Sequence, residues 1–158
     1  MNAPAETFMR EACRLAEESV RDGKGGPFGC VVVRRGEVVG RGQNRVTSAN
    51  DPTAHAEVVA IREACRKLGT FKLDDCELYT SCEPCPMCLA SAYWARIPAL
   101  FYGNTRQDAA VIGFDDELLY REIPLPIEQR SLAMKPLLRE EAQKAFRAWQ
   151  EKSDKIRY

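Results

Sequence analysis

The chain has 158 residues, of which 45% are hydrophobic and 29% charged, and this composition suits one soluble domain with a single core. Lysine plus arginine and aspartate plus glutamate both number 23, so the formal net charge is zero. This balance argues against a nucleic acid or an anionic membrane as partner, because such binding depends on clustered cations. We see no secretory signal and no apolar run near the roughly 18 residues of a membrane span, and therefore expect a cytoplasmic protein.

Hydrophobic periodicity predicts a first helix over residues 6–22 and a β-hairpin over 28–42. A loop at 50–53 precedes a helix over roughly 54–68, which Gly69 ends. The other predicted elements are a strand at 77–80, a helix at about 85–96, a strand at 99–102, a short helix at 115–121, a short strand near 131–135 and an amphipathic helix at about 138–152. Helices that alternate with strands in this way predict a three-layer α/β domain.

Two short motifs carry side chains that bind metals, namely His55-Ala56-Glu57 and Pro84-Cys85-Pro86-Met87-Cys88. Together they match the H-x-E and P-C-x-x-C signature of zinc deaminases. The 30 residues from His55 to Cys85 are enough for one helix and a returning strand, which brings the starts of two helices side by side. Cys85 and Cys88 share a helix face, so we expect His55, Cys85 and Cys88 to bind one Zn²⁺.

Three protein ligands leave a fourth position for water, as in a catalytic zinc site, and zinc lowers the pKa of that water toward ~7. Glu57 can accept and return the protons if it lies beside the metal without binding it. Residues i and i+2 point apart on a regular helix, so His55 and Glu57 converge only if the site lies beyond the end of the helix.

The alternative is a closed structural site in which Cys82 adds a third thiolate to His55 and the other two cysteines. His55 is the single histidine of the chain, which favours the catalytic interpretation, and we interpret Cys82 as a packed thiol. The odd total of seven cysteines and the crowding of three of them indicate metal binding in a reducing compartment rather than disulfides. The four cysteines without metal-ligand spacing are predicted to be packing residues: Cys13, Cys30, Cys65 and Cys76.

Five sequence motifs in this order resemble those of bacterial guanine deaminases with the cytidine-deaminase-like fold: GGPFG (25–29), QN (43–44), NDPTAHAE (50–57), SCEPCPMC (81–88) and GFDD (113–116). The resemblance covers nearly the whole chain. It implies a three-layer α/β/α fold whose mixed central sheet of about five strands is flanked by helices. It also implies one zinc per chain and the hydrolysis of guanine to xanthine and ammonia.

The resemblance further implies the residues that hold the purine. Phe28 and the His55 ring would sandwich it, Asn44 would hydrogen-bond it, and Ala56 would line the site. Asp116 would hold the edge near the 2-amino group and assist proton transfer to the leaving ammonia. The plainer alternatives are a core role for Phe28, a turn role for Asn44 and a helix-capping role for Asp116.

The last segment of the chain is predicted to belong to the same deaminase domain, which spans 1–158. In the family that the chain resembles, the segment corresponding to 138–158 is swapped onto a neighbouring subunit, where the terminal tyrosine closes the site. We therefore expect a homodimer in which Tyr158 of one chain seals the purine pocket of the other. The alternative is a frayed tail on a monomer.

Other functions remain open from the sequence. A tRNA-adenosine deaminase shares the zinc motif but requires a basic surface, which the zero net charge does not favour. A deaminase of guanosine, cytosine, isocytosine or ammeline shares more of these sequence features than a tRNA-adenosine deaminase does. A structural zinc module without catalysis is the third class.

Overall fold

The computed structural model describes residues 3–158, and these divide after Asp116 into two compact units, 3–116 and 117–158. The first unit holds the following elements: α1 (Ala3–Arg21), β1 (Gly29–Arg34), β2 (Glu37–Gln43), α2 (Val46–Ala49), α3 (Ala56–Leu68), β3 (Cys76–Cys82), α4 (Pro86–Trp94), β4 (Ala99–Asn104) and α5 (Arg106–Val111). The second unit holds α6 (Glu117–Glu122), a 3₁₀ helix (Ile127–Gln129) and α7 (Arg139–Glu151). None of the helices in the described part of the chain is long and apolar enough to cross a membrane.

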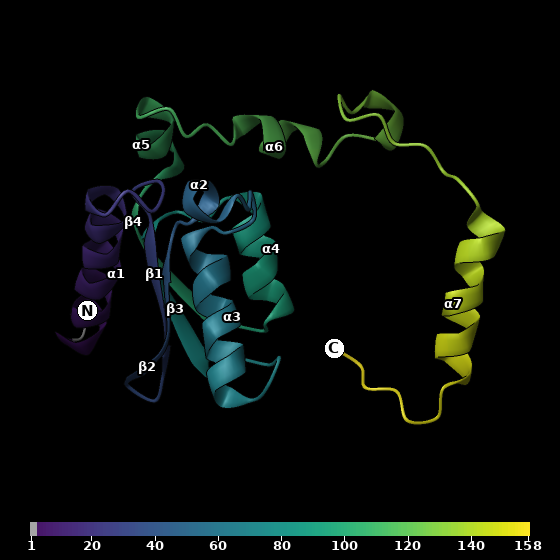
Figure 1. Ribbon diagram of the computed structural model, residues 1–158, viewed down its shortest axis with the longest axis horizontal. Helices are drawn as coiled ribbons and strands as arrows, with labels where there is room; N and C mark the ends of the chain where they lie inside the picture. Colours follow the sequence, from purple (N-terminus) through teal and green to yellow (C-terminus); the bar gives the residue numbers. More distant parts are fainter. Residues whose placement is uncertain (1–2) are drawn as a thin grey trace. The chain divides into compact units, whose positions relative to one another are not determined.

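The sheet of the first unit contains four strands in the order β2-β1-β3-β4 (Figure 1). Strand β1 runs antiparallel to both of its neighbours, whereas β3 and β4 are parallel, so the sheet is mixed as predicted. We expected about five strands, but the segment near 131–135 forms no strand in the part of the chain that the structure describes. A strand requires a hydrogen-bonded partner strand, and this segment has none there.

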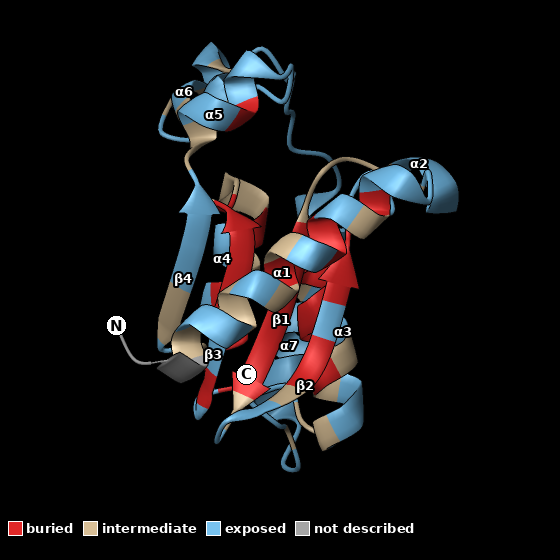
Figure 2. Ribbon diagram, turned by 90° about the vertical axis from the view of Figure 1, so that its left-hand side faces the viewer, coloured by how far each residue is buried: buried red, intermediate tan, exposed pale blue. Residues whose placement is uncertain are grey.

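Helices cover both faces of the sheet, which gives the three layers (Figure 1). Alternate side chains of β1 point to opposite faces: Val32 packs with residues of α3 and α4, and Val31 packs with Leu15 of α1. Strand β1 is therefore buried on both faces, as its run of valines predicted, while much of β4 at the edge of the sheet is exposed (Figure 2).

Helix α3 lies so close to β2 that only glycine fits at two positions of the strand. A Cβ atom on Gly42 would lie 1.9 Å from the carbonyl oxygen of Ala56, and one on Gly40 would lie 2.3 Å from that of Ala60. The two glycines remove the side chains that would separate strand from helix. This close approach brings the first turn of α3, which follows His55 and contains Glu57, against β2.

Candidate active site

The metal-ligand side chains come from the starts of α3 and α4. His55 is the N-cap residue of α3 and Cys85 is the N-cap residue of α4, and both have extended backbone conformations. Cys88 follows in the first turn of α4, which Pro86 begins. Both helices therefore direct the positive ends of their dipoles toward the same place, which favours thiolates there.

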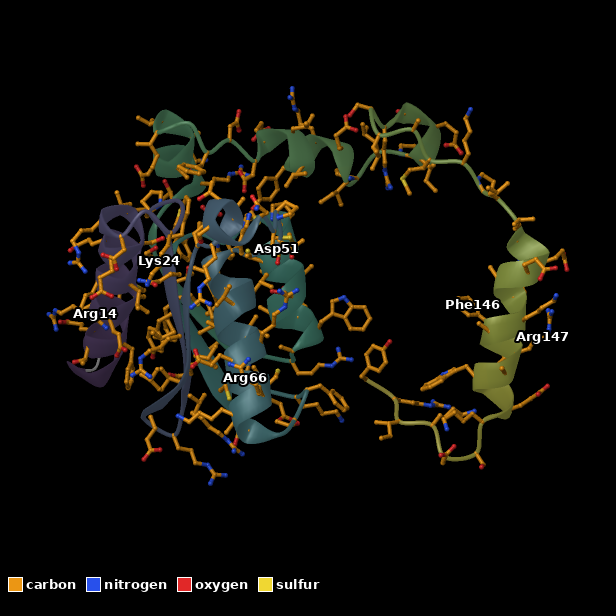
Figure 3. The ribbon with its side chains drawn as sticks, in the orientation of Figure 1. Arg14, Lys24, Asp51, Arg66, Phe146 and Arg147 are labelled. Carbon is orange, nitrogen blue, oxygen red and sulfur yellow. The ribbon has the colours of Figure 1, made fainter. Side chains whose placement is uncertain are left out.

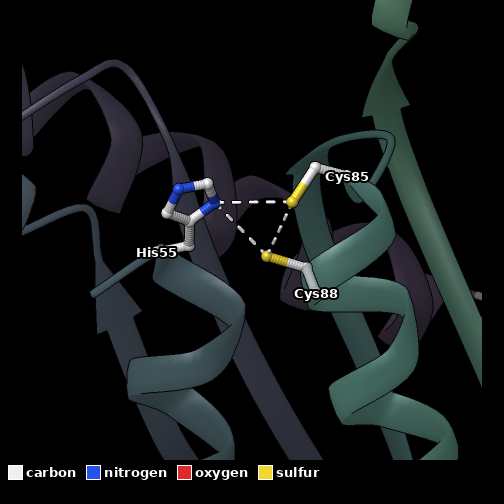
Figure 4. Close-up of side chains that lie close together, drawn as sticks. All are labelled: His55, Cys85 and Cys88. Atoms are coloured by element: carbon white, nitrogen blue, oxygen red, sulfur yellow. Dashed lines mark hydrogen bonds between the residues drawn. The ribbon is translucent and has the colours of Figure 1, made fainter. Parts of the chain in front are cut away.

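The three predicted ligands lie together (Figure 4). Nδ1 of His55 is 3.6 Å from Sγ of Cys85 and 3.4 Å from Sγ of Cys88, and the two sulfur atoms are 3.5 Å apart. Zinc–nitrogen and zinc–sulfur bond lengths at a tetrahedral angle require separations of about 3.6 Å between nitrogen and sulfur and about 3.8 Å between sulfurs. The arrangement of the three donors therefore fits a zinc ion.

Without a metal, the two thiols of this cluster depend on one another. Hydrogen bonding with Cys88 lowers the pKa of Cys85 to about 4, with a further contribution from His55. The same hydrogen bond and burial raise the pKa of Cys88. A cation that binds both sulfurs must therefore displace the proton of Cys88, so metal binding is coupled to proton release.

Glu57 lies in the first turn of α3, where its side chain is only 5% exposed. Its Oε1 accepts a hydrogen bond of 2.8 Å from the Thr80 hydroxyl. Burial raises the pKa of the carboxyl group, although hydrogen bonds with Thr80 and Cys88 act in the opposite direction. His55 precedes the helix rather than belonging to it, so the pair lies at the end of the helix, where their convergence was expected to be possible.

Cys82, the alternative third thiolate, is not part of the cluster of possible metal ligands found among the described residues. Its sulfur lies 3.6 Å from the carbonyl oxygen of Thr105. Burial, together with nearby acidic groups, raises the pKa of this thiol to about 11. Cys82 is thus placed as a packed thiol. All seven cysteines are free of disulfides.

Asn44 is 5% exposed and is held by the backbone around it. Its Oδ1 accepts hydrogen bonds of 3.2 Å from the backbone N–H groups of Gly26 and Val46, and its own backbone N–H donates to the carbonyl of Phe28. The turn role that we considered is therefore present. The same bonds fix the orientation of the amide, because the oxygen is committed to the backbone and the nitrogen must point elsewhere.

Phe28 packs partly against the core and forms an edge-to-face pair with Phe114, with ring centroids 4.9 Å apart. The analysis of the sequence quoted Phe114 within GFDD but gave it no role. The pairing shows that this motif contributes an aromatic ring beside Phe28. Large aromatic rings near a polar site can stack on a flat ligand.

Two further candidates lie within the first unit. Ala56 is fully buried at the start of α3, between the ligand His55 and Glu57. Asp116 is partly buried, and burial raises its pKa, with a smaller contribution from the charge of Cys85. Tyr158 is 72% exposed and belongs to the second unit, so its role in a purine pocket stays a prediction.

Comparisons with known proteins agree with this geometry. The family model of the cytidine and deoxycytidylate deaminase zinc-binding region matches residues 3–104. The chain is 52% identical to guanine deaminase from Bacillus subtilis over 153 residues, which cover 97% of this chain and 98% of that protein. The crystal structure of the same enzyme matches with a TM-score of 0.94 and covers 100% of this chain and 99% of the other.

More distant relatives share part of the chain. Guanine deaminase from Nitrosomonas europaea is 33% identical, with a TM-score of 0.68 and coverage of 73% of this chain and 66% of that one. A tRNA-specific adenosine deaminase from Aquifex aeolicus is 41% identical over 97 residues, which cover 61% of this chain and 64% of that protein.

Proposed function

The chain belongs to the zinc-dependent cytidine and deoxycytidylate deaminase family, within its guanine deaminase branch, and from this premise we infer that it hydrolyses guanine to xanthine and ammonia. The observation that carries the inference is the cluster of His55, Cys85 and Cys88 beside the buried carboxylate of Glu57. A zinc ion held by these three side chains supplies the Lewis acidity that activates water at neutral pH.

Each step of the reaction requires a group that moves a proton, and we propose Glu57 as that group, supported by its burial in the first turn of α3, next to His55. Its carboxylate accepts a proton from the attacking water and returns it to the amino group, which leaves as ammonia. General acid–base catalysis requires such a group within hydrogen-bond reach of the proton that it moves. The water oxygen adds to the ring carbon that bears the amino group, the adjacent ring nitrogen takes up the second proton of the water, and the carbon–nitrogen bond to the leaving ammonia then breaks. The reaction is a hydrolysis, so no redox partner is needed.

The substrate pocket follows from the residues around this centre. Asn44 presents a fixed amide, Phe28 and Phe114 present aromatic surface, and Asp116 supplies a carboxylate at the purine edge. Such a combination of flat apolar surface with a few fixed polar groups is typical of small-molecule sites. These assignments are supported by the contacts described above within the first unit and by the guanine deaminases that the chain resembles.

The test of the substrate is ammonia release from guanine, guanosine, cytosine, isocytosine and ammeline, measured beside adenosine deamination in a tRNA anticodon stem. We expect guanine to be the preferred substrate. Faster deamination of the tRNA would indicate a tRNA-adenosine deaminase instead. If the zinc-loaded protein released no ammonia from any of these substrates, the zinc site would be structural rather than catalytic.

We also propose that the protein is a homodimer in which residues 138–158 are swapped between subunits. Both units expose large apolar side chains: Tyr93 and Trp94 on α4, Tyr102 on β4, and Phe146 and Trp149 on α7. No residue of α7 is buried, although the helix is strongly amphipathic. Apolar surface of this extent normally meets another protein surface, and a second copy of the chain provides it.

Deletion of residues 155–158 tests the proposed role of Tyr158 in closing the pocket. We expect zinc content to stay at one per chain while guanine turnover or binding weakens, because an open pocket admits bulk water. A fully active truncated protein, or a native protein that is monomeric at working concentration, would exclude the swap.

The seven free cysteines support a reducing location, and we propose the cytoplasm.

A further inference from the structure

Thr80 places a hydroxyl group in the largely apolar layer between the sheet and α3. It is fully buried in β3, where it pairs with Cys30 of β1 and Tyr102 of β4. Leu78, two residues earlier on the strand, belongs to the core cluster that includes α3 and α4, so Thr80 points to the same face. A buried hydroxyl on such a face is costly unless it has a hydrogen-bond partner.

The partner of this hydroxyl is the carboxylate proposed to move protons. Oγ1 of Thr80 donates a hydrogen bond of 2.8 Å to Oε1 of Glu57, across 23 residues of sequence. The threonine sits on a strand that is paired on both sides, and its β-branched side chain has few rotamers. The donor is therefore held more rigidly than the longer glutamate side chain that it contacts.

We propose that Thr80 is the positioning residue of Glu57. By holding Oε1, its hydroxyl leaves Oε2 as the oxygen that exchanges protons with water and with the leaving amine. Proton transfer requires the accepting oxygen within hydrogen-bond reach of the reacting group, and a free glutamate would leave that position much of the time. The inference rests on the proposed role of Glu57 and assigns its orientation to a specific neighbour.

The experiment removes the hydroxyl of Thr80 with two substitutions. Thr80→Val removes it and keeps the shape of the side chain. Thr80→Ala also removes it, and Thr80→Ser, which differs from alanine by one oxygen atom, keeps it. We expect kcat for guanine to fall on the order of 10- to 100-fold in the valine and alanine variants, as for loss of a hydrogen bond to a charged group. KM should stay within about twofold, and serine should restore most of kcat.

Ser81→Ala is the matched control. Ser81 is the next residue of β3, is also buried, and uses its hydroxyl to accept a 3.0 Å hydrogen bond from the backbone of Gly29. Loss of the Ser81 hydroxyl should lower the free energy of unfolding without a comparable fall in kcat. Zinc content, measured for every variant, should stay at one per chain. If the valine variant does not fold, the serine and alanine pair decides the question, because neither adds volume.

A double-mutant cycle on metal-free protein tests the contact without relying on activity. Thr80→Val and Glu57→Ala should destabilise by less together than the sum of their separate effects, because both remove the same hydrogen bond. Additive effects on stability would overturn the proposed role of Thr80. Full kcat in Thr80→Val, together with an inactive Glu57→Gln, would also overturn it and would leave the proposed role of Glu57 in place. Wild-type turnover in Glu57→Gln would overturn the proposed function as well.

Discussion

The carboxylate of Glu57 is buried beside two sulfur atoms, a location in which a carboxylate that only stabilised the fold would be unfavourable. Glu57→Gln keeps the side-chain volume and can still accept from Thr80, but it cannot take up a proton. We expect zinc to remain bound while turnover falls roughly 10²- to 10⁴-fold. The measurement is steady-state ammonia release with metal analysis on the same sample.

Glu63→Gln is the control for that experiment, because Glu63 lies on the same helix and accepts a 2.7 Å hydrogen bond from the backbone of Arg41 at the surface. It should retain turnover. An active, zinc-loaded Glu57→Gln enzyme is the result that would remove Glu57 from the mechanism.

Asp116 supplies the second proposed carboxylate. An amide at this position can donate to the purine but cannot hold a proton for the leaving ammonia, so Asp116→Asn should lower kcat by about 10- to 100-fold. Asp115→Asn, one residue earlier, should have little effect on kcat. Equal loss in both variants would indicate that the segment needs its total negative charge rather than Asp116 itself.

At the scale of elements, α3 and α4 begin in an unusual way, because neither N-cap side chain caps its helix. His55 and Cys85 form no side-chain cap hydrogen bond and instead turn toward one another. The first turns of both helices should therefore depend on the metal. Chelation of zinc should lower the melting temperature and increase amide hydrogen exchange most strongly near residues 56–59 and 86–89. Exchange that increases elsewhere but not there would contradict this dependence.

The elements of the first unit could be predicted largely from sequence, since their patterns are local. The metal ligands could also be predicted. Cys85 and Cys88 belong to one short motif, and a single helix followed by a returning strand is enough to bring this motif beside His55. The short helices α2 and α5 were missed, although Thr105 and Asp108 form a capping box at the start of α5 that could have indicated it.

Contacts between distant segments could not be predicted in this way. The role of Thr80 depends on which strand residue faces Glu57, and that follows from the register of three strands and the closeness of α3. The pair of Phe28 and Phe114 likewise joins segments that no periodicity relates. The strand expected near 131–135 was wrong because periodicity does not supply a partner strand.

At the scale of the whole molecule, the proposed dimer depends on the apolar side of α7. Figure 3 shows Phe146 and Arg147 pointing to opposite sides of this helix, and Phe146 is 68% exposed. Phe146→Glu should convert the dimer to monomer and lower guanine turnover, because a buried charge without a partner opposes association. Light scattering beside an activity assay gives the result.

Arg147→Glu changes the charge on the other side of α7 and should leave both the dimer and the activity in place. A Phe146→Glu protein that stays dimeric and active would show that α7 does not form the subunit interface.

The division of the site along the chain has a consequence for evolution. The three candidate metal ligands and Glu57, the first proposed proton carrier, lie between positions 55 and 88, within the family match over 3–104. Asp116, which we propose assists the leaving ammonia, and Tyr158, which we propose closes the pocket, lie beyond that match. Changes beyond residue 104 can therefore alter how the pocket is closed while the three metal ligands are inherited unchanged.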